Sequence, residues 1–363
     1  MAAKLKQPIY DPAKTYDDNF DQGPFWDKVD GIVASQGDPA HRFLGQPIHS
    51  RFGIPAGPLL NSNYIKRAFE HGYDVLVYKT QRSRPFGVNE FPNVLFLDVD
   101  GDLTLEKAAQ PQLGKADTKK AAHEFSITNS FGNPSRGPEY WVDDLKKAIS
   151  YQGPGQLLLM SVCGTIEGDQ SSADYFGDFA NAAKLAADAG VSAIELNLSC
   201  PNVANEGVIC YTPEAVIEIG RRTKELVGNV PLVAKFGYFA PDQQDLLERI
   251  IKDSSPYYSA YSVINTIAAP VVDEAGEQAL PGPNRLKSGV CGASIRWAGL
   301  DMVQRLAALR QKLGLDYEII GVGGVMNADH FNDYRSAGAD VVQSATGAMW
   351  NPLLASEIKL DQA

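Results

Sequence analysis

Eight short apolar runs, rich in Val, Ile and Leu, recur from about residue 50 to the end of this 363-residue chain. They are residues 52–57, 74–80, 157–164, 193–199, 231–237, 261–267, 318–324 and 340–346. None keeps a strict alternation of polar and apolar residues, which indicates parallel strands buried on both faces. Helical stretches separate them, and eight strand–helix units predict an α/β fold, a (β/α)8 TIM barrel, rather than a doubly wound sheet.

The stretches between the strands carry helix start and stop residues. The clearest helices are expected at residues 172–190, 212–228, 297–314 and 328–338. In the first of them, Ser172 is a plausible N-cap and Gly190 a stop. In the second, Thr212 precedes Pro213 at the first helical position, and Gly228 ends the pattern.

Three segments lie outside this repeating unit. Residues 1–49 are polar with scattered aromatics and are expected to form an extension that packs on the barrel, with a short helix near 24–36. Residues 82–128 form a long insertion, and the proline-containing residues 268–290 predict a loop or small hairpin. We therefore expect a single barrel domain over 50–363, with loops inserted at its C-terminal face.

Composition excludes several classes of protein. A net charge of −11 argues against a nucleic-acid partner, and no window of 18 apolar residues predicts a membrane span. The N-terminal residues do not resemble a signal peptide, so a cytoplasmic location is expected. Five histidines show no metal-ligand spacing, and a disulfide scaffold would need more than the four cysteines present, Cys163, Cys200, Cys210 and Cys291.

Polar residues interrupt the apolar runs where the strands end. In this barrel class the active site lies at the C-terminal ends of the strands, and burying polar groups there costs free energy unless they have partners. The polar residues at these strand ends are Lys79, Thr80, Asn197, Lys235, Asn265, Thr266 and Thr346, with Cys200 just beyond its strand. The small residues at the same ends are Ala56, Gly57, Gly323, Gly324 and Ala345. The small residues after the last two strands favour a phosphate-binding site, although glycines also simply end strands tightly.

Two lysines and a group of asparagines are the candidates for ligand binding. Lys79 and Lys235 are either rim lysines that reach solvent, cations beside an anionic ligand, or a desolvated Schiff-base amine. The amides of Asn129, Asn133, Asn197, Asn202 and Asn265 match the donor and acceptor edges of a flat heterocycle, although asparagine is also common in turns.

Cys200 lies between two of these amides in the motif "NLSCPN". A thiolate there could act as a base or a nucleophile, and the alternative is an inert buried cysteine.

Together, "ELNLSCPN", "KT", "NSFGN", "VAKFG", "INT" and "GVGG" with "QSATG" resemble the dihydroorotate dehydrogenase family, and most closely its soluble, cysteine-containing class 1 branch. The resemblance covers most of residues 50–357 and implies bound FMN, a small-molecule substrate and a homodimer. It implies that FMN contacts Ala56, Gly57, Lys79, Thr80, Asn129, Asn197, Lys235, Ile264, Gly292, Gly323, Gly324, Ala345 and Thr346. It implies that the pyrimidine contacts Lys79, Asn129, Gly132, Asn133, Asn197, Asn202, Asn265 and Thr266.

The resemblance also implies a reaction, the oxidation of dihydroorotate to orotate in pyrimidine biosynthesis. The flavin takes the hydride from C6, Cys200 takes the proton from C5, and Lys235 stabilises the negative charge on the reduced ring. Fumarate is the expected electron acceptor. The alternatives are an FMN-dependent oxidoreductase of another dihydropyrimidine such as dihydrouracil, a Schiff-base lyase that uses Lys235, and a flavin-binding protein without catalysis.

Overall fold

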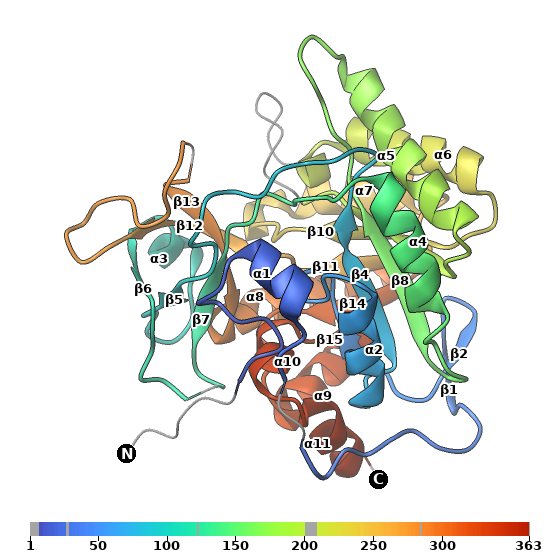
Figure 1. Ribbon diagram of the computed structural model, residues 1–363. Coiled ribbons are helices and arrows are strands. Elements are labelled where there is room, and N and C mark those ends of the chain that lie inside the picture. The colour runs from blue at the N-terminus through green and yellow to red at the C-terminus, as the bar shows by residue number, and fades with distance from the viewer. Residues whose placement is uncertain (1–6, 27–28, 122, 200–208, 284, 363) are drawn as a thin grey trace.

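An eight-stranded parallel barrel forms the centre of the molecule, which we describe from a computed structural model (Figure 1). The structure describes all residues except 1–6, 27–28, 122, 200–208, 284 and 363. The barrel strands are β3 (Phe52–Ile54), β4 (Val75–Gln81), β8 (Leu157–Val162), β9 (Ala193–Asn197), β10 (Leu232–Phe236), β11 (Ala260–Val263), β14 (Glu318–Val322) and β15 (Val341–Gln343). They pair in chain order, and β15 closes on β3, so the predicted TIM barrel is confirmed.

Helices surround the barrel on the outside. They are α2 (Ser62–Glu70), α4 (Pro138–Ile149), α5 (Ser172–Asp188), α6 (Pro213–Val227), α7 (Gln244–Ser254), α8 (Arg296–Leu313), α9 (Ala328–Ala337), α10 (Thr346–Trp350) and α11 (Leu354–Asp361), with single 3₁₀ turns at Ile209–Tyr211, Pro241–Gln243 and Ala293–Ile295. Over the described part of the chain, no helix combines the length and apolar character that crossing a membrane requires.

The four predicted helices are present, with shifts of one or two residues at their ends. The N-cap of α5 is Ser171 and not the predicted Ser172: the Ser171 hydroxyl accepts from the Asp174 N–H, and the Asp174 carboxylate accepts from the Ser171 N–H. This reciprocal capping box satisfies two donors that a helix start leaves open, which decides the boundary. Thr212 does occupy the α6 N-cap, but its side chain makes no capping hydrogen bond.

Several predicted strands are too long. The run 261–267 is two elements, because β11 ends at Val263 and the chain leaves the barrel before β12 (Ile267–Val272) begins. Asn265 lies between them, where its N–H donates to the Phe236 carbonyl. The strand predicted at 340–346 likewise ends at Gln343, since helix α10 already starts at Thr346.

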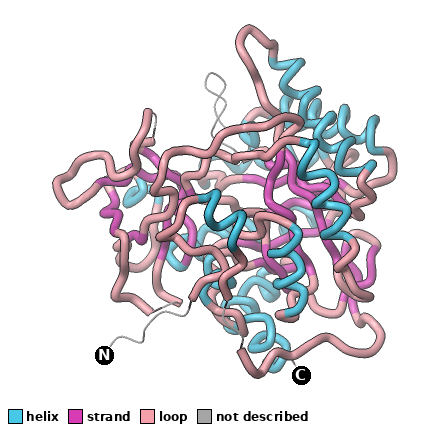
Figure 2. The backbone as a smooth tube through the Cα atoms, viewed as in Figure 1, coloured by secondary structure: helices cyan, strands magenta, loops and turns pink. Residues whose placement is uncertain are grey.

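The two insertions meet to form a second, smaller barrel beside the first one (Figure 2). It contains β5 (Phe96–Leu97), β6 (Gln112–Lys115), β7 (Ser126–Asn129), β12 and β13 (Lys287–Gly292), with α3 (Leu105–Ala108) near them. β12 and β13 pair antiparallel, so the hairpin predicted at 268–290 is confirmed. Their pairing with β6 and β7 joins segments more than 150 residues apart and was not predicted.

The N-terminal segment contacts both ends of the main barrel: its hairpin packs at the amino ends of the strands, and Tyr10 and Tyr16 lie at the carboxyl ends. Its hairpin, β1 (His41–Phe43) and β2 (Gln46–Ile48), brings Phe43, Leu44 and Ile48 into a buried cluster with interior residues at the start of the barrel strands. Its helix is α1 (Tyr16–Gln22), capped by Thr15, and not the predicted helix near 24–36. The described residues of 24–36 form no helix, and there the Val33 N–H donates to Ser356 Oγ instead of to a helical partner.

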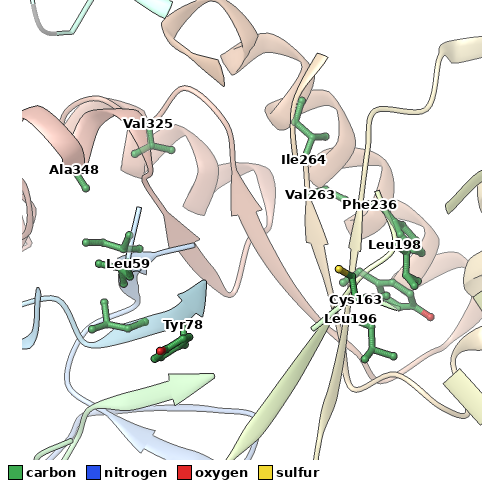
Figure 3. Packing of buried hydrophobic residues seen from close by; sticks show 14 of the residues in the cluster. Leu59, Tyr78, Cys163, Leu196, Leu198, Phe236, Val263, Ile264, Val325 and Ala348 are labelled. Atoms are coloured by element: carbon green, nitrogen blue, oxygen red, sulfur yellow. The ribbon is translucent and has the colours of Figure 1, made fainter. Parts of the chain in front are cut away.

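The main hydrophobic core lies between the barrel strands and the helices. Figure 3 shows Cys163, Leu196, Leu198 and Phe236 in this layer, all without exposed surface. The inward-facing residues differ along the barrel axis: apolar ones such as Val77 and Leu159 fill the lower part. Polar ones such as Ser161, Glu195 and Lys235 follow toward the carboxyl ends. This polar layer forms the floor of the pocket described next, and Lys235 is the member of these three that lines the pocket.

Candidate active site

A pocket opens at the carboxyl ends of the barrel strands, between the main barrel, the small barrel and the N-terminal segment. Its volume is about 920 Å³ with the open solvent at its mouth included. The strand ends predicted to carry chemistry therefore do meet at one site.

Most of the predicted site residues line this pocket. They are Ala56, Gly57, Lys79, Thr80, Asn129, Asn133, Asn197, Lys235, Ile264, Asn265, Thr266, Ala345 and Thr346. Gly132, Gly292, Gly323 and Gly324 are not among the lining residues. Cys200 and Asn202 lie outside the described residues.

The pocket wall is positively charged. Lys79 and Lys235 line it, whereas no Asp, Glu or Arg is among its described lining residues. Lys79 is buried and its ammonium donates to the carbonyls of Thr80 (3.3 Å) and Pro134 (3.1 Å). Two buried ammonium groups line this wall, so it favours an anionic ligand, although Glu195 beneath the wall offsets part of the charge of Lys235.

The positive charge of Lys235 is partly offset by the carboxylate of Glu195, which lies beneath it. Its Nζ lies 3.8 Å from Glu195 Oε1, and both side chains are almost completely buried. Glu195 in turn accepts from Ser161 Oγ at 2.9 Å, and the Ser161 and Thr80 hydroxyls are 2.9 Å apart. Asn197 Nδ2 donates to Thr80 Oγ1 at 3.4 Å, so one polar network connects four barrel strands beneath the pocket.

Some wall residues were not predicted. Tyr10 and Tyr16 come from the N-terminal segment, Val94, Ile127, Thr128 and Phe131 from the first insertion and its end, and Cys291 and Met349 from near the C-terminal ends of other elements. No sequence pattern connects these residues to the strand ends. Glu195, which lies beneath the wall, could have been singled out from the sequence, because it is the one charged residue inside the apolar run "AIELNL".

The aromatic wall is neutral and closely packed. Tyr10 and Tyr16 both contact the Phe131 ring edge-on, at 5.5 and 6.0 Å between centroids. Burial raises the pKa of both tyrosines well above the usual range, so their hydroxyls stay protonated. The Lys79 ammonium lies 5.8 Å from the Tyr16 ring centroid, within cation–π range.

Cys291 is the described cysteine that lines the pocket. Burial raises the pKa of its thiol to about 11, against a smaller opposing effect of the Thr346 hydroxyl. Burial also raises the pKa of Cys210, to about 12. Neither thiol is therefore a thiolate near neutral pH, and neither suits proton abstraction.

Two adjacent glycines follow strand β14 next to the pocket residue Val322. Gly323 has φ +126° and Gly324 φ +67°, and a Cβ on Gly324 would lie 2.7 Å from Arg296 Cβ. Only glycine adopts this backbone there without strain. The result is a tight turn after β14, whose neighbouring strand β15 is followed by Ala345 and Thr346 at the start of α10.

Known proteins are similar to this chain over most of its length. A family model described as dihydroorotate dehydrogenase matches residues 103–361. A dihydroorotate dehydrogenase of Dictyostelium discoideum is 39% identical over 98% of this chain and 97% of its own.

Bacterial relatives are more distant. The catalytic subunit of dihydroorotate dehydrogenase B (NAD(+)) from Staphylococcus carnosus is 27% identical over 74% of this chain and 82% of its own. Dihydroorotate dehydrogenase A (fumarate) from Lactobacillus helveticus is 25% identical over 76% and 85%. The resemblance inferred from the motifs is confirmed, and the chain belongs to the dihydroorotate dehydrogenase family of oxidoreductases.

Proposed function

We propose that this chain oxidises (S)-dihydroorotate to orotate with FMN as its cofactor, in pyrimidine biosynthesis. The observation that carries the proposal is the pocket itself: two buried lysines and several amides line it, and no carboxylate does among the described lining residues. Such a wall suits an anionic pyrimidine beside a flat ring with N–H and C=O edges.

The residues present fit FMN. Amides and a lysine of the pocket wall offer donors for the ring edge. Gly292, Gly323 and Gly324 do not line the pocket, but their positive φ angles form backbone turns at the ends of β13 and β14, where we propose that the phosphate binds. The ring and ribityl chain would contact Ala56, Gly57, Lys79, Thr80, Asn129, Asn197, Lys235 and Ile264, and the phosphate Gly292, Gly323, Gly324, Ala345 and Thr346. FMN, when bound, supplies the acceptor for the substrate hydride.

The chain's own residues would bind and deprotonate the substrate. Lys79 would hold the dihydroorotate carboxylate, with the amides of Asn129, Asn197 and Asn265 on the pyrimidine edges. Asn202, Gly132, Asn133 and Thr266 would complete that site. Cys200 thiolate would remove the C5 proton, and Lys235 would stabilise the negative charge that the ring gains.

The test is a visible spectrum followed by an anaerobic titration. Purified protein should be yellow, or should gain thermal stability when FMN is added. Dihydroorotate should bleach the flavin, and dihydrouracil should not, because it has no carboxylate for Lys79. Colourless protein without an FMN-dependent thermal shift would refute the proposal. Bleaching by dihydrouracil alone would assign the other dihydropyrimidine, and borohydride trapping of a carbonyl substrate on Lys235 would assign a lyase.

The electron acceptor is proposed to be fumarate. One relative is named for fumarate and several are named for NAD(+). Reoxidation of the reduced protein by each compound, followed at the flavin absorbance, distinguishes them. We also propose a cytoplasmic homodimer, which a sedimentation measurement and cell fractionation would test.

Tyr16 should influence substrate binding through Lys79. Tyr16→Leu removes the ring beside the ammonium. A cation–π contact is worth about 0.5–2 kcal/mol, so we expect KM for dihydroorotate to rise roughly two- to thirtyfold with little change in kcat. Tyr16→Phe keeps the ring and should restore the wild-type KM. Steady-state kinetics of both variants check this. An equal rise of KM in Tyr16→Phe and Tyr16→Leu would assign the effect to the hydroxyl and not to the ring.

A further inference from the structure

A buried carboxylate lies directly beneath the pocket, and the proposed reaction does not use it. Glu195 on β9 has no exposed surface. Its Oε1 accepts from Ser161 and lies near Lys235, whereas its Oε2 is buried with no hydrogen-bond partner among the described residues. Burying a charged group with one oxygen unsatisfied costs free energy, and such a group calls for an explanation.

The hydrogen bonds that start at Glu195 run in one direction. A carboxylate only accepts hydrogen bonds, so the Ser161 hydroxyl donates its single proton to Glu195 Oε1. Ser161 can then only accept from Thr80, and Thr80 must be the donor of that 2.9 Å bond. Having given its proton to Ser161, Thr80 can only accept from Asn197 Nδ2.

The end of this chain is a residue of the pocket wall. Because Thr80 can only accept, the donor atom of the Asn197 amide, Nδ2, has to face it. The other amide atom, Oδ1, then accepts from Ser199 Oγ at 3.0 Å. The donor and acceptor roles are therefore consistent along all three hydrogen bonds. The Glu195 carboxylate, three hydrogen bonds away, determines which side of the Asn197 amide is the donor and which is the acceptor.

Glu195 also determines how much positive charge the pocket receives from Lys235. The carboxylate is 3.8 Å from the ammonium and no water-exposed surface separates them. Opposite charges at this distance in a buried site attenuate each other's field strongly. A ligand above Lys235 therefore meets a partly neutralised cation.

We propose that Glu195 is a positioning residue that acts on the pocket in two ways, by attenuating the charge of Lys235 and by directing the chain Ser161–Thr80–Asn197. This inference rests on the proposed function, in which FMN and the pyrimidine occupy the pocket. It assigns a role to Glu195, a carboxylate of the polar layer described above.

The first measurement is the midpoint potential of bound FMN in Glu195→Gln. The substitution keeps the shape of the side chain and removes its charge, so the full charge of Lys235 favours the reduced ring. We expect the reduction equilibrium to shift about tenfold toward reduced FMN, which is about 30 mV for a two-electron couple. Dye equilibration with the holoenzyme measures it.

The second measurement is orotate affinity, by difference spectra of the oxidised holoenzyme. In Glu195→Gln the terminal group can also donate, so the direction of the chain is no longer determined. Ser161→Ala cuts the chain and leaves the Glu195 charge in place. Both variants should bind orotate roughly three- to tenfold more weakly, the effect of about one net hydrogen bond, and Ser161→Ala should leave the potential near the wild-type value.

Asp74→Asn is the matched control. Asp74 is equally buried and forms an ion pair with Lys359 at 3.1 Å, but it immediately precedes β4, at the opposite end of the barrel. Its loss should lower thermal stability without moving the potential or the orotate affinity.

Each outcome is decisive. Wild-type potential in Glu195→Gln, a shift in the negative direction, or unchanged orotate affinity in Ser161→Ala overturns the inference. If those results are obtained in yellow protein that dihydroorotate bleaches, the proposed function still stands. Protein that binds no FMN, or whose FMN dihydroorotate does not bleach, overturns both.

Discussion

Replacing Cys200 by alanine is expected to slow flavin reduction by dihydroorotate about 10²–10⁴-fold, the usual contribution of a general base. The position of Cys200 between Asn197 and Asn202 in "NLSCPN" motivates this expectation. The described pocket thiol, Cys291, does not replace it, because burial raises its pKa to about 11. Anaerobic stopped-flow measurement of flavin bleaching gives the rate directly.

The Cys200 experiment has two further variants. Cys200→Ser should also be severely impaired, because a hydroxyl is a far weaker acid than a thiol. Cys210→Ala is the control for loss of a buried thiol: Cys210 does not line the pocket, and burial raises its pKa to about 12. We expect Cys210→Ala to bleach at the wild-type rate once it is folded.

The same base predicts a pH dependence. The wild-type reductive rate should rise with pH as the Cys200 thiol ionises, from a reference pKa of about 8.5. Cys200→Ala should lose this rise while FMN stays bound. Near wild-type bleaching in Cys200→Ala, with the wild-type pH profile, would show that another group takes the proton.

Lys235→Ala should lower the rate of flavin reduction about 10²–10³-fold, comparable to the loss of one preorganised donor at a developing negative charge. Lys235 and Lys79 are the described lysines of the pocket wall, and we assign Lys79 to the substrate carboxylate. FMN affinity should fall as well. Stopped-flow bleaching and fluorescence titration of the apoprotein with FMN measure the two effects.

The ion pair of Lys235 with Glu195 allows a double-variant experiment that separates stability from catalysis. Lys235→Ala leaves Glu195 buried and unpaired, and breaking a buried ion pair typically costs about 3–5 kcal/mol of stability. The double variant Lys235→Met with Glu195→Gln removes both charges and should recover stability but not the rate of reduction. Recovery of the rate together with stability, or an unchanged rate in the single variant, would remove the proposed role of Lys235.

The barrel could be predicted because its information is local. Each apolar run reports that its strand is buried on both faces, and consecutive parallel strands linked by helices pair in chain order. Parallel strands also end on one face, so Lys79, Asn197, Lys235 and Thr346 could be placed at a common site before any contact was known.

The small barrel could not be predicted in this way. Its strands β5 and β12 are short or partly exposed, and they are held by pairing with segments distant in the chain. Residues such as Tyr10 and Tyr16 reach the pocket only because the N-terminal segment folds back across the barrel. Hydrophobic period records which face of an element is buried, but not which distant segment covers it.

By itself, the sequence determined the barrel, the edge at which its polar residues meet and the family. Tertiary structure alone decided that Glu195 accepts from Ser161 and lies beside Lys235, and that Thr80 and Asn197 continue the chain of hydrogen bonds. These residues lie on β4, β8, β9 and β10 and are separated along the chain by up to 155 positions. Only closure of the barrel brings them within hydrogen-bond distance, because donor and acceptor directions depend on which neighbour each buried group meets.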